Sequence, residues 1–204
     1  METIRFEQVG KTFGTHEIFR DLTFSILPQK VTALCAPSGF GKTTLLRMLC
    51  GLEEPTAGTI TGRYPEETAC VFQENRLFPC AAWQNIACVC KGTATERKAL
   101  ALTWLSRVGL AQEATKKPSA LSGGQQRRVA LAQALASERP LLLLDEPFSG
   151  IDAARRSELL TLLKTVCLGK TTVLVSHAVE EVTALADVCY DLSFSGAALR
   201  AISR

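Results

Sequence analysis

The residues best suited to chemistry in this chain lie at positions 36–44, which read Ala-Pro-Ser-Gly-Phe-Gly-Lys-Thr-Thr. The apolar run Val31–Cys35 precedes them, and an apolar pattern of helical type follows at residues 45–50. A loop between a buried strand and the start of a helix binds phosphate well, because free N–H groups and the helix dipole favour an anion there. Gly39 and Gly41 let the backbone turn tightly, so that successive N–H groups point inward. We therefore predict a phosphate-binding loop.

The spacing within this loop follows G-x-x-x-x-G-K-[ST] except at the first position, where Ala36 replaces glycine. Alanine fits there if its φ is negative. The pattern predicts that Lys42 reaches the β- and γ-phosphates of a nucleotide and that the Thr43 hydroxyl binds Mg²⁺. The residues predicted to line the phosphates are Ala36, Pro37, Ser38, Gly39, Phe40, Gly41, Lys42, Thr43 and Thr44. For this segment alone, a chance glycine-rich loop is the alternative.

Composition narrows the class of protein. The chain has 204 residues, a formal charge of +3 and eight cysteines. Its basic residues are scattered, so nucleic acid is not an expected partner. No apolar run approaches the ~20 residues that span a bilayer, and the N-terminus lacks a signal-peptide core, so we expect a cytoplasmic protein. The cysteines show no paired C-x-x-C spacing, which favours small apolar core residues over a metal site or a disulfide framework.

The predicted elements alternate between strands and helices. Strand patterns occur at residues 4–9, 18–26, 31–35, 59–60, 69–72, 141–144, 171–175 and 188–192, and residues 11–14 are expected to turn the chain. Helical patterns occupy residues 81–109, and others end near residues 137, 163 and 186. The pattern predicts an α/β domain with a helical insertion over residues 81–120.

Polar side chains stand at the carboxyl ends of three predicted strands. Asp145 and Glu146 follow four leucines, a run typical of a central parallel strand that opens at the ligand edge of a sheet. A carboxylate there can hold Mg²⁺ directly or through water. Gln73 follows residues 69–72, and His177 follows residues 171–175. Taken alone, Gln73 and His177 would be interpreted as surface residues.

A further motif, Leu121-Ser122-Gly123-Gly124-Gln125, precedes another predicted helix. With the phosphate loop before it and Asp145-Glu146 after it, the chain resembles the nucleotide-binding subunit of ATP-binding cassette (ABC) transporters along almost its whole length. The resemblance implies one domain, residues 1–204, of the P-loop NTPase fold. Its expected core, residues 1–80 and 121–204, combines a mixed or parallel central sheet with an antiparallel β subdomain. Residues 81–120 are the expected α-helical subdomain.

The resemblance also implies roles in ATP hydrolysis. Lys42, Glu146 and His177 correspond to the catalytic residues: Glu146 to the general base and His177 to the switch residue that contacts the γ-phosphate. Gln73 corresponds to the Q-loop glutamine, which senses Mg²⁺ and the attacking water. The implied Mg²⁺ ligands are Thr43, Gln73 and Asp145. Phe13 occupies the place of the aromatic residue that stacks on adenine.

Other implied nucleotide contacts cross a head-to-tail pair of subunits. Ser122, Gly123, Gly124 and Gln125 form the signature motif, which completes the ATP site of the second subunit. Asp152 matches the D-loop aspartate at that interface, and it is also a predicted helix N-cap. The second subunit is expected to be another copy of this chain or a paralogous cassette.

The resemblance to importer subunits for nitrate, sulfonates and taurine rests on residues 71–79, and Pro118 before the signature also favours an importer. It implies transmembrane permease subunits, received in a groove formed by residues 74–90, and an extracytoplasmic substrate-binding protein. The chain is then expected on the inner face of the membrane. Its sequence does not identify the transported substrate, because substrate contacts belong to the other subunits.

Several residues depart from the family pattern. Phe40 is bulky where small residues are usual, Gly150-Ile151 replaces Ala-Leu, and Gln133 replaces a common arginine. None of these changes removes Lys42 or the residues at the strand ends, so we expect active hydrolysis. The alternatives are a degenerate cassette that binds ATP beside a more active partner, and an ABC ATPase that acts on DNA or ribosomes. An ATPase that acts on DNA would need a long coiled-coil insertion, and one that acts on ribosomes usually carries two cassettes; this sequence shows neither feature.

Overall fold

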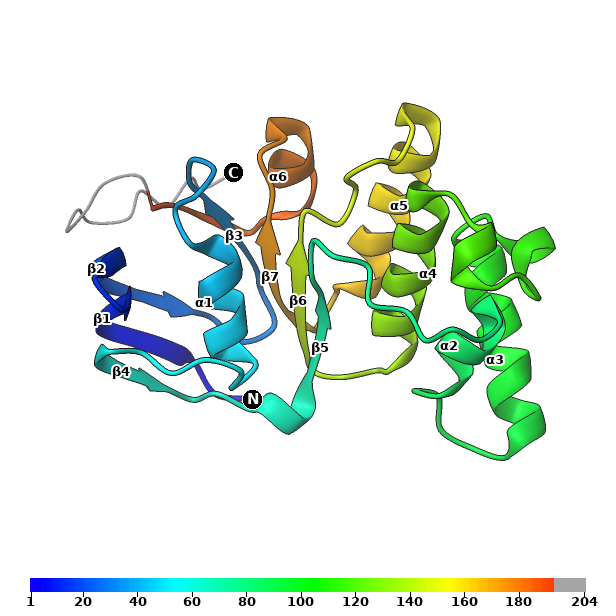
Figure 1. Ribbon diagram of the computed structural model, residues 1–204, viewed down its shortest axis with the longest axis horizontal. Coiled ribbons are helices and arrows are strands. Elements are labelled where there is room, and N and C mark those ends of the chain that lie inside the picture. The colour runs from blue at the N-terminus through cyan, green and yellow to red at the C-terminus, as the bar shows by residue number, and fades with distance from the viewer. Residues whose placement is uncertain (193–204) are drawn as a thin grey trace.

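The computed structural model describes residues 1–192, which form two sheets and the helices around them (Figure 1). The strands are β1 (Ile4–Phe13), β2 (His16–Ile26), β3 (Val31–Cys35), β4 (Ala57–Thr61), β5 (Thr68–Val71), β6 (Leu141–Asp145), β7 (Thr171–Val175) and β8 (Val188–Asp191). The α-helices are α1 (Lys42–Leu49), α2 (Ala82–Ala87), α3 (Ala94–Arg107), α4 (Gly123–Ala136), α5 (Ala153–Val166) and α6 (Val179–Leu185). Short 3₁₀ helices are η1 (Pro65–Glu67), η2 (Ala111–Glu113) and η3 (Pro118–Ala120).

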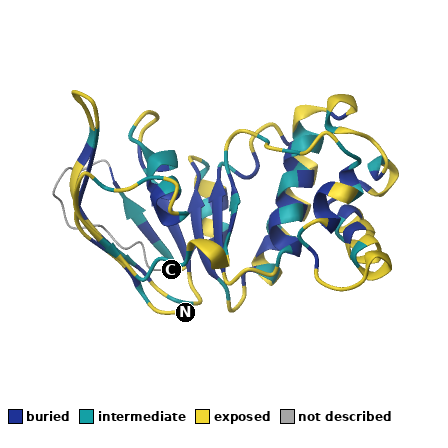
Figure 2. Ribbon diagram, turned by 60° about the horizontal axis from the view of Figure 1, so that its bottom comes forward, coloured by how far each residue is buried: buried dark blue, intermediate teal, exposed yellow. Residues whose placement is uncertain are grey.

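The larger sheet has the strand order β5-β6-β7-β3-β8, and all its pairs are parallel. Every residue of β6 and of β7 is buried, as expected for strands covered on both faces (Figure 2). Because the strands are parallel, the carboxyl ends of β3, β5, β6 and β7 meet at one edge. The predicted α/β fold is therefore confirmed, and this edge gathers the polar residues that follow the strands.

The smaller sheet is antiparallel, with the order β2-β1-β4. Its first strand is longer than predicted: the pairing of β1 with β2 continues to Phe13 opposite His16. The turn therefore lies at residues 14–15, and of the predicted turn at residues 11–14 only Gly14 belongs to it. Register shifts between Val9, Lys11 and Thr12 break the simple alternation that marks a strand in the sequence. In the sequence, the charged residue Lys11 favours a polar turn over a strand. In the structure its side chain is buried, and its ammonium donates a hydrogen bond to Glu53 at 3.0 Å.

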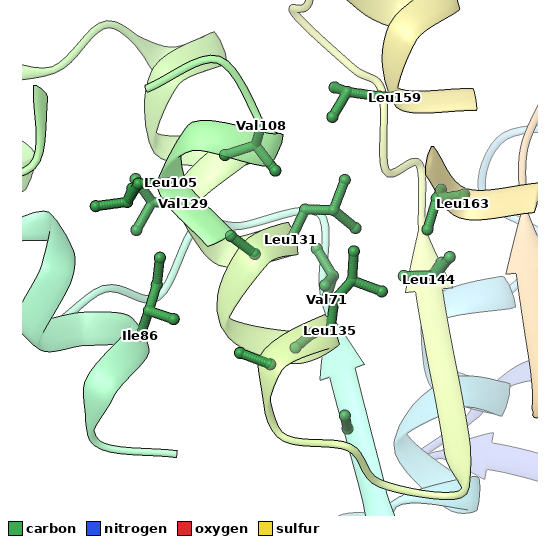
Figure 3. Packing of buried hydrophobic residues seen from close by; sticks show 14 of the residues in the cluster. Val71, Ile86, Leu105, Val108, Val129, Leu131, Leu135, Leu144, Leu159 and Leu163 are labelled. Atoms are coloured by element: carbon green, nitrogen blue, oxygen red, sulfur yellow. The ribbon is translucent and has the colours of Figure 1, made fainter. Parts of the chain in front are cut away.

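The two larger apolar cores cover the two faces of the parallel sheet. One lies toward the antiparallel sheet and includes Leu45, Leu46 and Leu49 of α1. The other surrounds α4, which contributes Val129, Leu131 and Leu135 and contacts β5, α2 and α3 (Figure 3). The helices α2 and α3 thus reach the parallel sheet through α4, which contacts β5. The division of the chain at residues 81–120 stays a prediction.

The starts of α4 and α5 follow the expected capping chemistry. Asp152 is the N-cap of α5, where its side chain accepts a hydrogen bond from the Arg155 N–H at 3.0 Å, as predicted. Ser122 caps α4 in the same way and forms a capping box with Gln125. Within residues 1–192, none of the helices has the length and apolar character required to cross a bilayer.

Candidate active site

The loop between β3 and α1 places the predicted phosphate contacts. Gly41 is the N-cap of α1, with φ 95°, a backbone conformation that side-chain-bearing residues rarely adopt. A Cβ on Gly41 would also lie 2.3 Å from Cγ2 of Ile18, because β2 passes directly beside the loop. Gly39 has φ 83° but faces open space. Glycine is therefore required at Gly41 for two reasons and at Gly39 for one.

The two departures within the loop are accommodated by the core. Ala36 does not adopt a positive φ and is buried, so its Cβ causes no strain, as the sequence argument required. Phe40 stacks on Phe19 with ring centroids 6.2 Å apart, on the side of the antiparallel sheet. Its side chain lies outside the cavity described next.

A cavity of about 470 Å³ opens at the carboxyl edge of the parallel sheet, beside the start of α1. It is lined by Ile18, Ser38, Gly39, Gly41, Lys42, Thr43, Thr44, Gln73, Asp145, Glu146, Ser149 and His177. The structure thus brings together the phosphate loop with the residues at the ends of β5, β6 and β7 (Figure 1).

Lys42 is folded back onto its own loop. Its Nζ donates hydrogen bonds to the carbonyl oxygens of Ala36 at 2.7 Å and Pro37 at 2.9 Å. Burial lowers the pKa of Lys42, and the carboxylates of Glu146 and Asp145 oppose that shift. The arrangement holds a cation at the cavity wall, where it can bind phosphate oxygens by charge and hydrogen bonding.

Two oxygen-bearing side chains, those of Thr43 and Asp145, line the same cavity as Lys42. The hydroxyl of Thr43 donates to Oδ2 of Asp145 at 2.6 Å, and Asp145 is only 2% exposed. Residues 1–192 contain no group of three or more His, Cys, Asp or Glu side chains suited to a metal ion. Mg²⁺ fits the Thr43–Asp145 pair, because this ion prefers oxygen ligands and often uses one or two protein groups together with phosphates and water.

Glu146 and His177 form the second polar pair. Glu146 has φ 49°, and its N–H donates to the carbonyl of Val175 at 2.9 Å, which turns its side chain into the cavity. Its Oε1 is 3.2 Å from Nε2 of His177 but accepts no hydrogen bond from the described residues. Burial raises the pKa of Glu146, whereas His177 opposes the shift. A carboxylate with a raised pKa and a free oxygen is suited to accept a proton.

Some predicted contacts lie elsewhere within this single chain. Phe13 is 44% exposed at the tip of the β1–β2 hairpin and does not line the cavity; its ring has the Lys11 ammonium 4.5 Å from the centroid. The residues Pro37, Phe40, Ser122, Gly123, Gly124, Gln125 and Asp152 are also absent from the cavity lining, as is the buried Ala36. For the signature and D-loop residues this agrees with a role toward a second subunit, which stays a prediction.

The two signature glycines face different surroundings. A Cβ on Gly123 would meet no atom within 4 Å, whereas a Cβ on Gly124 would lie 2.5 Å from the carbonyl oxygen of Gly150 in the same chain. Gly123 therefore leaves room for an approaching group, and Gly124 is needed because α4 packs closely against the backbone of Gly150. Gly150 itself has φ 73°, which explains why glycine suits this position.

Two residues that line the cavity, Ile18 and Ser149, were not predicted from the sequence. Ile18 is one residue of an alternating strand and carries no chemical signal of its own. Ser149 follows Glu146 in a turn closed by its N–H to the Glu146 carbonyl at 3.1 Å. Its closeness in sequence to Glu146 was the signal that could have identified it.

The phosphate loop, the paired carboxylates and the parallel sheet together define a P-loop nucleotide-binding site. Comparison with known proteins agrees: residues 19–149 match the model of the family described as ABC transporter. The chain belongs to the ABC transporter family.

Relatives and solved structures give finer comparisons. The chain is 44% identical, over 87% of its length and 68% of the relative's, to "Aliphatic sulfonates import ATP-binding protein SsuB 3" of Pseudomonas savastanoi pv. phaseolicola. It is 40% identical, over 89% of its length and 68% of the relative's, to "Aliphatic sulfonates import ATP-binding protein SsuB 1" of Agrobacterium fabrum. The dimeric structure of the ATP-binding cassette MJ0796 in a post-hydrolysis state with ADP and Pi matches with a TM-score of 0.85 and 27% identity, over 93% of this chain and 94% of that one.

Proposed function

We propose that this chain hydrolyses ATP as a subunit of an ABC importer. The observation that carries the proposal is the convergence of Lys42, the Thr43–Asp145 pair and the Glu146–His177 pair on one cavity. Phosphoryl transfer depends mainly on positioning and on charge stabilisation, and this cavity supplies both. Family membership and the ADP-bound and Pi-bound relative support the same conclusion.

Each pair has a separate task in the proposed reaction. Lys42 and the N–H groups before α1 bind the β- and γ-phosphates. Glu146 accepts a proton from the attacking water, and His177, within reach of Glu146 Oε1, contacts the γ-phosphate. Thr43, Asp145 and Gln73 would hold Mg²⁺, which when bound neutralises charge on the phosphates.

A second cassette completes the site in this proposal. Gly123 faces open space at the start of α4, where the first N–H groups of a helix lack partners within the helix, so that this end can approach a γ-phosphate held by another subunit. The dimeric structures of MJ0796 support this arrangement. ATP then acts as a ligand of the closed pair, and hydrolysis releases it. Phe13 and Asp152 are proposed to contact the adenine and the second subunit, respectively.

The proposed cargo is an aliphatic sulfonate, on the strength of relatives that are 40% to 44% identical and carry that name. The chain would then work on the inner face of the membrane with permease subunits and an extracytoplasmic substrate-binding protein. Phe78, exposed before α2, lies in the segment proposed to receive a helix of the permease.

ATPase and uptake measurements test this proposal. We expect the purified chain, or its complex with permease subunits, to release phosphate from ATP and the Lys42→Ala variant to release almost none. Sulfonate uptake into vesicles that contain the complete importer should need both ATP and Lys42. ATP binding without turnover in every assembly would instead indicate a degenerate cassette, and turnover without uptake would refute the assigned cargo.

A further inference from the structure

We propose that Arg127 is a positioning residue that fixes the Gln73 segment and Glu146 relative to each other. The inference rests on the proposed ATPase function. Arg127 lies in α4, two residues beyond the signature motif, and is 2% exposed. Its position in the sequence gave no sign of this role, because it is one of two neighbouring arginines on a helix.

The guanidinium of Arg127 bridges two segments of backbone. Its Nη1 donates to the carbonyl oxygen of Phe72, and to Gln73 O and Asn75 Oδ1 at 3.4 Å each. Its Nη2 donates to the carbonyl oxygen of Asp145, and to Glu146 O at 2.7 Å. One side chain therefore joins the residues after β5 to those at the end of β6.

This bridge begins where the sheet stops. The paired register of β5 with β6 ends at Val71 opposite Leu144. Beyond that pair no ladder connects the two strands, so Gln73 and Glu146 depend on side-chain bonds for their separation. Glu146 is held toward β7 by its N–H bond to the Val175 carbonyl and toward β5 through Arg127. Arg127 thus supplies the restraint toward β5 on a residue with positive φ, whose carbonyl also accepts from the Ser149 N–H at 3.1 Å.

Arginine is suited to this position by its shape. Its planar fork directs donors to two sides at once, whereas a lysine ammonium is a single point of charge. Burial lowers the pKa of Arg127, and the charges of Asp145 and Glu146 oppose that shift. The buried Nε–H of Arg127 donates to no partner among the described residues, so the carbonyl contacts of the two terminal nitrogens provide the compensation for burial.

Asn75 extends the bridge to the start of the signature helix. Its side-chain amide donates to the Gly123 carbonyl at 3.4 Å while its Oδ1 accepts from Arg127. A displacement of the segment after β5, which we propose to meet the permease, would therefore be transmitted to the backbone of Glu146. Arg127 thus links the segment proposed to receive the permease, residues 74–90, to Glu146, the proposed general base. Arg127 itself does not line the cavity.

The test compares Arg127→Met, Arg127→Lys and Arg128→Met in the complete chain. Arg128 is a matched control, since it is the next residue of α4 but donates to Val108 O at 2.9 Å and Gly109 O at 3.1 Å instead of to the segments after β5 and β6. We expect Arg127→Met to lower kcat by about tenfold or more while ATP Kd changes by less than about threefold, because positioning acts on the chemical step. Arg127→Lys should restore part of the loss, and Arg128→Met should leave kcat nearly unchanged.

Amide hydrogen exchange gives a readout that does not need hydrolysis. Arg127→Met should speed exchange in both residues 72–76 and residues 145–149, whereas Arg128→Met should speed it only near residues 105–110. Unchanged exchange in either of the first two segments, or equal kcat losses from Arg127→Met and Arg128→Met, would overturn the inference. A wild-type chain that does not hydrolyse ATP would refute the proposed function instead, and exchange would still decide the role of Arg127. If Arg127→Met does not fold, the same comparison is made with Arg127→Lys.

Discussion

Two glycines of the phosphate loop allow the steric reasoning to be tested with a matched pair of substitutions. Gly39 and Gly41 both have positive φ, 83° and 95°. A Cβ on Gly39 meets no atom within 4 Å, whereas a Cβ on Gly41 lies 2.3 Å from Ile18 Cγ2. Gly39→Ala therefore measures backbone strain alone, and Gly41→Ala measures strain plus a clash.

The magnitudes follow from these two causes. A non-glycine residue in a sparsely populated backbone region costs about 1–3 kcal/mol. Overpacking adds about 1–3 kcal/mol, since Ile18 belongs to β2 and must shift. We expect the free energy of unfolding to fall by about 1–3 kcal/mol in Gly39→Ala and by about 2–6 kcal/mol in Gly41→Ala.

Urea denaturation of the two variants and the wild type measures both losses. A further variant, Gly41→Ala with Ile18→Ala, removes the clashing Cγ2. Its loss should be smaller than the sum of the two single losses by about 1 kcal/mol or more, because the two sites share one contact. Equal losses for Gly39→Ala and Gly41→Ala, together with additivity in the double variant, would refute the claim that β2 excludes a side chain at Gly41.

Further predictions concern the reaction and its pH dependence. Glu146→Gln should lower kcat by about 10²–10⁴-fold. If the chain pairs with itself, this variant should change from monomer to dimer only with Mg²⁺ and ATP, which light-scattering mass measures. A monomer that still binds ATP would show that the chain does not close on its own. Because burial raises the pKa of Glu146, kcat should decline on acidification at a higher pH than an ordinary glutamate would give, and a decline set only by an unshifted carboxyl would contradict the geometry. The folded state holds the proton of the Glu146 carboxyl more tightly than the unfolded state does. The contribution of Glu146 to stability is therefore present at low pH and is lost as pH rises through the raised pKa. Glu146→Gln should consequently raise Tm at pH 8 more than at pH 5. Thr43→Val should weaken Mg²⁺-dependent ATP binding about tenfold or more while leaving binding in EDTA nearly unchanged, as titration calorimetry would show. Asp152→Ala removes the N-cap of α5 and should cost about 1 kcal/mol of stability, whereas Asp152→Asn should cost much less in the same denaturation assay.

The sequence alone determined the chemistry of the site and the type of most elements. Lys42 and Thr43 were identified from the spacing of the phosphate loop, and Asp145 and Glu146 from their place after a run of four leucines. The buried strand before the loop was predicted with its observed bounds, Val31–Cys35. These signals are local: glycine sets the turn, apolar runs set the buried strands, and a side-chain oxygen before a helix sets its start. The parallel arrangement then follows, because strands separated by helices pair in parallel.

Only the tertiary structure decided which distant residues meet. Ile18 lines the cavity and excludes a side chain at Gly41 because β2 folds back beside the loop, a contact that no local pattern contains. Phe40 points to Phe19 and away from the cavity for the same reason. Arg127 joins Gln73 to Glu146 across residues far apart in the chain. Backbone propensity acts over a few residues, whereas packing and buried hydrogen bonds depend on which elements become neighbours, and these long-range choices are made only when the whole domain folds.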